Sequence, residues 1–409
     1  SVMSEETKKA PAIRFQGFTD DWEQRKLSEM TEYKNGKGHE DKQRTHGKYE
    51  LINLNSISID GGLKHSGKYI DDANETLKKY DLVMVLSDIG HGDLLGRVAL
   101  IPEDNRFVLN QRVALLRPKS LFNPLFLFSY INQHQKYFKN QGAGMSQLNI
   151  SRGSVESFSS YVPSAEEQTK IGTFFKQLDD TIALHQRKLT LLKQLKQTYL
   201  QALFPQSELN IPTLRFARFS DSWEHRKVSS LAKETFGGGT PKTGVKKYWK
   251  GSFPWIQSSD LTTNQLHNVQ PTKFITEEAI KQSATHNVPG NSIAIVTRVG
   301  VGKLALMRSS YSTSQDFLSL SNLNVDAVFG VYCLYKMLQR EVNNIQGTSI
   351  KGITKADLLG KCVSVPTKVE EQVKIGAFFK KIDDTIDFHE SKLKHILELK
   401  KAFLEKMFL

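Results

Sequence analysis

Hydrophobic residues recur with an unbroken helical period in two long segments of the chain, residues 166–204 and 370–408. In each segment the seam positions are separated by alternating steps of four and three residues, a mean spacing of about 3.5 residues that is typical of paired coiled-coil helices. The predicted seam comprises Ile171, Phe175, Leu178, Ile182, His185, Leu189 and Leu192 in the first segment, and Ile375, Phe379, Ile382, Ile386, His389, Leu393 and Ile396 in the second.

The two segments are copies of one another. Aligned at an offset of 204 residues, 20 of 39 positions are identical, which indicates an internal repeat. We expect the two helices to pack antiparallel, so that the regions preceding them lie at opposite ends of a rigid rod related by a pseudo-two-fold axis. His185 and His389 would then face each other. A polar seam position that sets the helix register is favoured over a metal site, because only two imidazoles are offered, without a cysteine or a further carboxylate at ligand spacing.

A second repeated motif opens each half, PAIRFQGFTDDWEQRKLSEM at 11–30 and PTLRFARFSDSWEHRKVSSL at 212–231. Its aromatic residues predict an anchor that packs each domain against its helix. The interiors, 31–145 and 232–345, diverge almost completely and contain short β-branched runs bounded by Gly, Asn, Asp and Pro. We therefore expect an α+β protein of four segments: a mostly-β domain at 1–162, a long helix at 163–204, a second mostly-β domain at 205–365 and a second helix at 366–409.

The charge balance favours a polyanionic partner. Lysine and arginine total 56 against 43 aspartate and glutamate residues, a net charge of +13. Two basic, glycine-rich loops at 34–48 and 237–251 occupy corresponding places in the two halves and suit phosphate contacts, although solvated charged loops are the alternative. The chain has no apolar run of signal-peptide or membrane type, and its only two cysteines, Cys333 and Cys362, are expected to be buried free thiols, so we predict a cytoplasmic protein.

The motifs of common nucleic-acid enzymes are missing from the sequence. Residues 299–305 (VGVGKLA) lack the spacing of a phosphate-binding loop, and 123–126 (NPLF) departs from the methyltransferase motif at its third residue. The paired aspartates of each long helix, Asp179 and Asp180 with Asp383 and Asp384, are sequence neighbours and point in different directions, so we predict a partner-facing surface rather than a catalytic pair. Two rival interpretations are an enzyme with an unrecognised site and a scaffold that binds only proteins.

The two motifs together resemble a known family. Two variable domains, each opened by a PxxRFxxFxxxWE run and closed by an EEQxKIGxFFxxxDDTI run that leads into a long helix, are similar to the specificity subunit of type I restriction-modification systems. Residues 238–261 resemble the start of that family's target-recognition domain, whereas Asn35–Gly38 stands in the corresponding place of the first half.

The resemblance implies that each domain reads one half of a bipartite double-stranded DNA target and that the helices set the distance between the halves. It also implies that this chain has no chemistry and binds no cofactor or metal. Two modification subunits would bind S-adenosylmethionine and methylate adenine, and two restriction subunits would use ATP and Mg²⁺. The predicted DNA contacts are Lys37, Lys42, Arg44, His46, Gln147 and Asn149 in the first domain, and Thr240, Lys242, Lys246, Lys247, Ser258, Ser259, Arg298, Gln346 and Lys351 in the second.

Overall fold

The computed structural model describes residues 9–89, 91–145, 147–206, 211–344 and 352–409. These residues form two compact units, one containing 1–186 and 392–409 and the other 187–391. Each unit therefore combines one mixed domain with the first half of the long helix that follows it and the last half of the other long helix. No described helix is long and apolar enough to cross a membrane.

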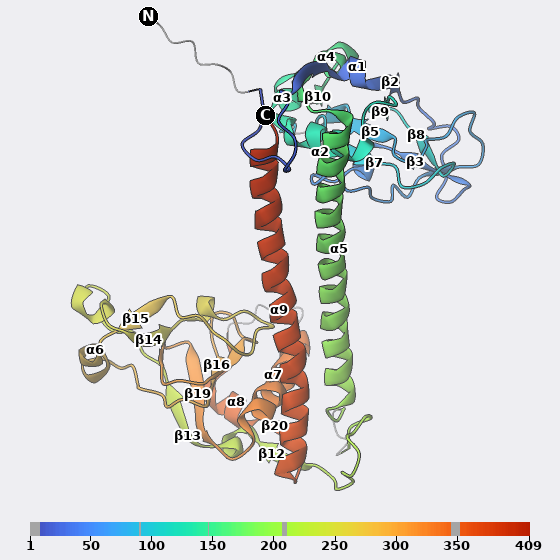
Figure 1. Cartoon of the computed structure of the whole chain (residues 1–409). Coiled ribbons are helices and arrows are strands. Elements are labelled where there is room, and N and C mark those ends of the chain that lie inside the picture. Colours follow the sequence, from blue (N-terminus) through green and yellow to red (C-terminus); the bar gives the residue numbers. More distant parts are fainter. Residues whose placement is uncertain (1–8, 90, 146, 207–210, 345–351) are drawn as a thin grey trace, which may run out of the picture. The chain divides into compact units, whose positions relative to one another are not determined.

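The domain of the first unit contains two sheets (Figure 1). The four-stranded sheet has the order β2 (Thr31–Asn35), β9 (Val113–Pro118), β5 (Leu82–Val85) and β7 (Val98–Leu100), with antiparallel neighbours. The three-stranded sheet has the order β4 (Tyr69–Ile70), β3 (Tyr49–Ile52) and β8 (Phe107–Leu109). All four residues of β5 are buried because its two faces belong to different cores: Val83 and Val85 face the core between the sheets, while Leu82 and Met84 face the helices.

The domain of the second unit repeats this topology. Its four-stranded sheet has the order β13 (Ala232–Gly237), β19 (Phe317–Leu323), β16 (Ser292–Val296) and β17 (Leu304–Met307). Its three-stranded sheet has the order β15 (Lys273–Ile275), β14 (Phe253–Ile256) and β18 (Ser312–Thr313). The structure confirms the expected mixture of sheets and helices in each half, and the shared strand order shows that divergent interiors adopt one architecture.

Shorter elements complete the two domains. The first unit adds β1 (Glu23–Lys26), α1 (Leu27–Met30), β6 (Ser87–Asp88), α2 (Pro124–Gln133), α3 (Gln135–Asn140), β10 (Leu148–Asn149), α4 (Arg152–Ser157) and β11 (Ser159–Val162). The second adds β12 (Glu224–Lys227), α6 (Glu277–Lys281), α7 (Ala327–Asn344), α8 (Lys355–Gly360) and β20 (Cys362–Val365). The long helices are α5 (Ala165–Ala202) and α9 (Val369–Met407). Of the two cysteines, Cys333 is buried as expected, but Cys362 is exposed at the start of β20.

The repeated opening motif is a structural anchor, as predicted. In the first unit β1 pairs antiparallel with β11, and the Arg14 guanidinium donates two hydrogen bonds, of 2.9 and 2.7 Å, to the carboxylate of Glu167 in the first turn of α5. Trp22 Nε1 donates to the same carboxylate at 3.2 Å. In the second unit Arg215 makes the equivalent pair of bonds to Glu371, at 2.7 and 2.8 Å. Each anchor ties the start of a domain to the helix that follows it.

The closing motif is explained by helix packing. The side-chain amide of Gln168 accepts from Asn123 N and donates to Pro163 O, so it links the start of α2 to the start of α5. At Gly172, a Cβ atom would lie 2.6 Å from Phe126 N, so only glycine permits this approach of α5 to α2. Gln372 and Gly376 make the same contacts with Asp326 and Phe329 at the start of α7. The shared EEQxKIG residues therefore form the contact between each domain and the long helix that follows it.

The last turns of each long helix enter the core of a domain within the same unit. In the first unit Met407 of α9 and the adjoining Phe408 are buried beside Phe126 and Phe175. Phe174 packs edge-on against Phe403, and Asp179 forms a 2.5 Å ion pair with Lys400. The later residue of α5 meets the earlier residue of α9, so the two helix segments of this unit run in opposite directions. In the second unit Lys196 of α5 forms the equivalent 2.6 Å ion pair with Asp383 of α9.

These ion pairs correct part of the predicted partner surface. Asp383 is buried, and its carboxylate also accepts a 2.7 Å hydrogen bond from Tyr332 of α7; Asp179 is half-buried. Asp383 is therefore enclosed within its unit, whereas the Asp179 carboxylate is engaged with Lys400 but keeps part of its surface exposed. Asp180 and Asp384 remain exposed, each paired with a lysine one turn earlier. Tyr332 also contacts His267, and burial lowers the pKa of His267 to about 4, so this imidazole is neutral at pH 7.

The buried pair of the second unit yields a stability prediction. Asp383→Asn leaves the ammonium of Lys196 buried without a counter-charge, so we expect the free energy of unfolding to fall by about 3 kcal/mol. Asp384→Asn, one residue along the same helix but exposed, is the matched control and should change it by less than about 0.5 kcal/mol. Denaturant unfolding of the two variants checks this, and equal losses would show that the pair contributes nothing beyond a surface charge.

Candidate nucleic-acid interface

Five segments of the first unit meet where strands of its two sheets end. Backbone hydrogen bonds join them: Asn110 N donates to Ile52 O at 2.9 Å, Gly36 N to Val113 O at 3.0 Å, Leu86 N to Arg112 O at 3.0 Å and Ile150 N to Leu86 O at 2.9 Å. We call this region the first loop face; it comprises residues 36–38, 53–56, 86–88, 110–112 and 147–150. Because strand ends and backbone hydrogen bonds hold these turns, their exposed side chains project from a fixed backbone.

The second unit has a corresponding loop face, which comprises residues 238–240, 257–260, 297–298, 314–316 and 352–353. The bonds that join it are Gly239 N to Thr313 O at 2.9 Å, Ser314 N to Ile256 O at 2.9 Å, Thr297 N to Asp316 O at 2.7 Å and Ile353 N to Thr297 O at 2.8 Å. Three of these four match bonds of the first loop face residue by residue. The same turns therefore carry different side chains in the two units.

One glycine in each loop face is required by close backbone contact. A Cβ atom at Gly36 would lie 1.6 Å from Asn110 O, and one at Gly238 would lie 1.7 Å from Ser314 O. Both distances are far below any possible contact, so a side chain at either position would push the neighbouring turn away. The backbone of Asn35–Gly38 in the first half thus corresponds to that of Gly237–Thr240 in the second, since each packs a glycine against the neighbouring turn.

The structure brings some predicted DNA-contact residues together and separates others. Lys37, Gln147 and Asn149 lie in the first loop face, and Thr240, Ser258, Ser259 and Arg298 lie in the second. Lys42, Arg44 and His46 lie outside the face in the exposed loop before β3, where Arg44 forms an ion pair with Asp71 at 2.9 Å. Lys242, Lys246 and Lys247 lie in the corresponding loop of the second unit, and Lys247 pairs with Glu278. Gln346 and Lys351 fall outside the described residues.

Sequence reasoning missed several exposed polar residues of the loop faces. These are Asn55, Gln111 and Arg112 in the first face and Gln315 in the second, with the half-buried Gln257 beside it. Each sits in a short turn directly after a strand, next to residues buried in the sheet. The one available signal was an amide or arginine at the end of a hydrophobic run, a pattern that many ordinary turns share.

A cavity of about 220 Å³ adjoins the first loop face. Its lining includes three lysines, Lys34, Lys37 and Lys42, two carboxylates, Asp72 and Glu75, and apolar residues such as Val108 and Leu115. Lys34 is paired with Glu75, and this hydrogen bond lowers the pKa of the Glu75 carboxyl, which stays ionised. Lys37 and Lys42 form no ion pair with any described residue, so their charges remain available to an anion.

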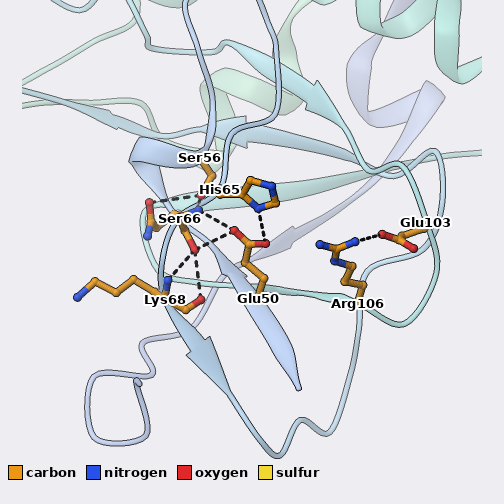
Figure 2. Close-up of polar contacts among 8 residues, drawn as sticks. Glu50, Ser56, His65, Ser66, Lys68, Glu103 and Arg106 are labelled. Carbon is orange, nitrogen blue, oxygen red and sulfur yellow. Dashed lines mark hydrogen bonds and ion pairs between the residues drawn. The ribbon is translucent and has the colours of Figure 1, made fainter. Parts of the chain in front are cut away.

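A further basic segment of the first unit was not predicted. Glu50 of β3 is buried, and its carboxylate accepts a 2.6 Å hydrogen bond from Ser66 N and contacts His65 Nδ1 at 3.1 Å (Figure 2). These bonds hold the exposed side chains of His65 and Lys68 on one turn.

The described residues contain no group of three or more His, Cys, Asp or Glu side chains that could hold a metal ion.

Comparisons with known proteins agree on one family. The family model described as "Type I restriction modification DNA specificity domain" matches residues 19–194 and 220–398. The chain is 30% identical over 182 residues to the type I restriction enzyme MjaIX specificity subunit of Methanocaldococcus jannaschii, a match that covers 43% of this chain and 41% of that protein. It is 28% identical over 217 residues to the EcoR124I/EcoR124II specificity subunit of Escherichia coli, covering 49% and 52%. The chain thus spans about half the length of the curated relatives it matches.

The fold also matches a solved structure. The S subunit of a type I restriction-modification system from M. genitalium superposes with a TM-score of 0.69 over 98% of this chain and 99% of that chain. The identity is 15%, so this likeness concerns the fold. The match extends over both units rather than one domain.

Gly238 provides a test of the loop face. Gly238→Ala places a methyl group against Ser314 O, so we expect the turn 314–316 to be displaced and the free energy of unfolding to fall by roughly 2 kcal/mol or more. Gly237→Ala is the matched control, because nothing lies within 4 Å of its added Cβ atom. Denaturant unfolding compares the two, and a Gly238→Ala variant as stable as Gly237→Ala would contradict the close approach.

Proposed function

Because the chain belongs to the family of type I restriction-modification DNA specificity domains, a family of recognition modules rather than enzymes, we propose that it is the DNA sequence-recognition subunit of a type I complex. Each domain reads one half of a bipartite double-stranded DNA target through its loop face. The observation that carries this proposal is the pair of equivalent loop faces with different side chains. One framework that presents two different polar surfaces is what recognition of two different half-sites requires.

The chemistry of the loop faces supports direct contact with DNA. Amide and guanidinium groups pair with base edges in the major groove, while lysines position a protein on phosphate. Asn55, Gln111, Arg112 and Asn149 supply such groups in the first unit, and Thr240, Gln315 and Arg298 do so in the second. The basic loops beside the faces, with Lys42, Arg44 and His46 or Lys242, Lys246 and Lys247, suit the flanking phosphates. The net charge of +13 favours the same partner.

The long helices support a ruler between the half-sites. We propose the four-segment division at 1–162, 163–204, 205–365 and 366–409, with α5 and α9 forming an antiparallel coiled coil and the two halves related by a pseudo-two-fold axis. Seam residues including Ile171, Phe175, Ile182, Ile375, Phe379 and Ile386 are buried, as a seam requires. The equivalent ion pairs Asp179–Lys400 and Lys196–Asp383 favour one register of the helices.

We propose that the catalytic steps belong to partner subunits. Two modification subunits would bind S-adenosylmethionine and methylate adenine, and two restriction subunits would use ATP and Mg²⁺, while this chain binds no cofactor. Exposed apolar residues on the long helices suit docking of the modification subunits. In the first unit these are Leu184 of α5 with Leu397 and Leu399 of α9; in the second they are Leu191 and Leu195 of α5 with Phe388 of α9. Leu184 corresponds to Phe388 and Leu195 to Leu399 in the repeat, so both units offer a similar apolar surface.

The decisive experiment is detection of adenine methylation by sequencing the DNA of cells that express this chain together with its modification subunit. Cells expressing the modification subunit alone are the control. We expect a split motif that appears only when this chain is present, because the loop faces supply the sequence readout. Replacing residues 31–145 with the interior of another specificity subunit should change one half of the motif and leave the other intact.

Two outcomes would contradict the proposal. If the two proteins form a complex but no motif appears, the chain is a scaffold that binds only proteins. If the purified chain alone methylates or cleaves DNA with S-adenosylmethionine or Mg²⁺, it is an enzyme. A binding assay separates these cases further, since affinity for duplex DNA that depends on phosphate contacts falls steeply with salt.

The docking surface has its own test. Leu195→Glu and Leu399→Glu together place a charge in the exposed apolar surface of each unit, and loss of one buried leucine costs about 1.5–3 kcal/mol, so we expect co-purification with the modification subunit to weaken at least tenfold. The control is Gln177→Glu, an exposed change on α5. Undiminished assembly of the double variant would place the modification subunit elsewhere.

A further inference from the structure

Both loop faces carry a glutamine at the same turn position. Gln111 follows Asn110, whose backbone N–H bonds to the end of β3; Gln315 follows Ser314, whose N–H bonds to the end of β14. The next residue in each turn accepts from the backbone of the adjacent hairpin, at Leu86 or Thr297. The flanking sequences, VLNQRVAL and STSQDFLS, share little besides this glutamine. Both side chains are exposed, although the preceding residues are buried.

Each glutamine is also held by the segment that follows the first strand of its domain. Gln111 Nε2 donates to the carboxylate of Glu40, which lies after β2. Thr240 Oγ1, after β13, donates to Gln315 Oε1 at 3.1 Å. The turn backbone and one end of each amide are therefore fixed. A side chain fixed in this way loses little rotamer entropy when it meets a ligand, which is the condition for discriminating contacts.

Each anchor uses one hydrogen-bonding site of its amide and leaves the others for a ligand. Gln111 Nε2 has two hydrogens, so with one of them bound to Glu40 the second N–H and the carbonyl oxygen remain available. With Thr240 bound at one lone pair of its carbonyl oxygen, Gln315 keeps both N–H groups of Nε2 for donation. In the major groove an acceptor matches the exocyclic amine of adenine or cytosine, while a donor matches guanine O6 or N7, adenine N7 or thymine O4.

We propose that Gln111 and Gln315 are specificity-determining residues, one for each half of the target, and that Glu40 and Thr240 are positioning residues that hold each amide in place for contact with the base. This inference rests on the proposed function. It assigns contact with a base edge to the remaining sites: the carbonyl oxygen and one N–H of Gln111, and the two N–H groups of Gln315. The two half-sites are thus read from equivalent turns by amides that are anchored at different atoms.

The test uses the full chain assembled with its modification subunit and scores the methylated motif by sequencing. Gln111→Ala should relax discrimination at one base pair of the first half by about tenfold, with the second half unchanged. Gln315→Ala should do the reverse. Glu40→Ala should relax discrimination at the same base pair as Gln111→Ala. Glu40→Gln should keep the discrimination of the wild type, because a glutamine carbonyl can still accept from Gln111 Nε2. Gln24→Ala, an exposed change on β1, is the matched control.

The outcomes separate the inference from the proposed function. If the wild-type complex yields no motif, both are overturned. If the wild type yields a split motif that Gln111→Ala and Gln315→Ala leave unchanged, only the glutamine inference is wrong. Loss of all methylation in either variant, with assembly and unfolding unchanged, would assign that glutamine to overall binding rather than to base choice and would also overturn it. If Glu40→Ala leaves discrimination at that base pair unchanged, Glu40 is not a positioning residue.

Discussion

The carboxylates of Glu167 and Glu371 hold the architecture together. Each is almost completely buried in the first turn of a long helix. An arginine from the opening motif of its domain neutralises it through two hydrogen bonds. The pairing raises the pKa of Arg14 and Arg215, which remain charged. Removing one partner of such a pair typically costs about 3–5 kcal/mol, because the remaining charge stays buried. The domain, its closing strand and the helix are therefore joined at one point.

The residues around this contact between domain and helix form a constant framework, and they are distinct from the turns whose side chains differ between the two units. Residues near it, such as Gly172 and Gly376, have no freedom, since any side chain would strike the backbone of α2 or α7. At the far ends of the strands only the backbone of the turns is constrained, by Gly36 or Gly238 and the hydrogen bonds around them. Side chains there can change without loss of the fold. This arrangement suits the proposed function, in which the side chains of the loop faces read DNA from a constant framework.

The two units differ in how they hold the incoming helix. At the end of α5, Arg340 donates a 2.8 Å hydrogen bond to Pro205 O; at the end of α9, His134 Nε2 contacts Leu409 O at 2.8 Å. These acceptors are equivalent in the repeat, and both lie two or three residues beyond the end of a long helix. Trp22 reaches the buried glutamate, whereas the indole N–H of Trp223 is buried and has no partner among the described residues. The repeat therefore preserves positions more strictly than individual contacts.

The amino-acid sequence by itself determined the long helices, the duplicated anchors and the mixed domains, because hydrophobic period and repeated motifs are local properties of the chain. It also pointed to Lys37, Thr240 and Arg298, which lie in polar loops between strands, and to Asn149, which lies in the short strand β10. Tertiary structure alone decided that Asp179 and Asp383 each pair with a lysine of the other long helix, because those lysines lie more than 180 residues away in the chain. It likewise decided that Gln111 meets Glu40 and that Gln315 meets Thr240. Those contacts depend on where strands end in space, which no local pattern records.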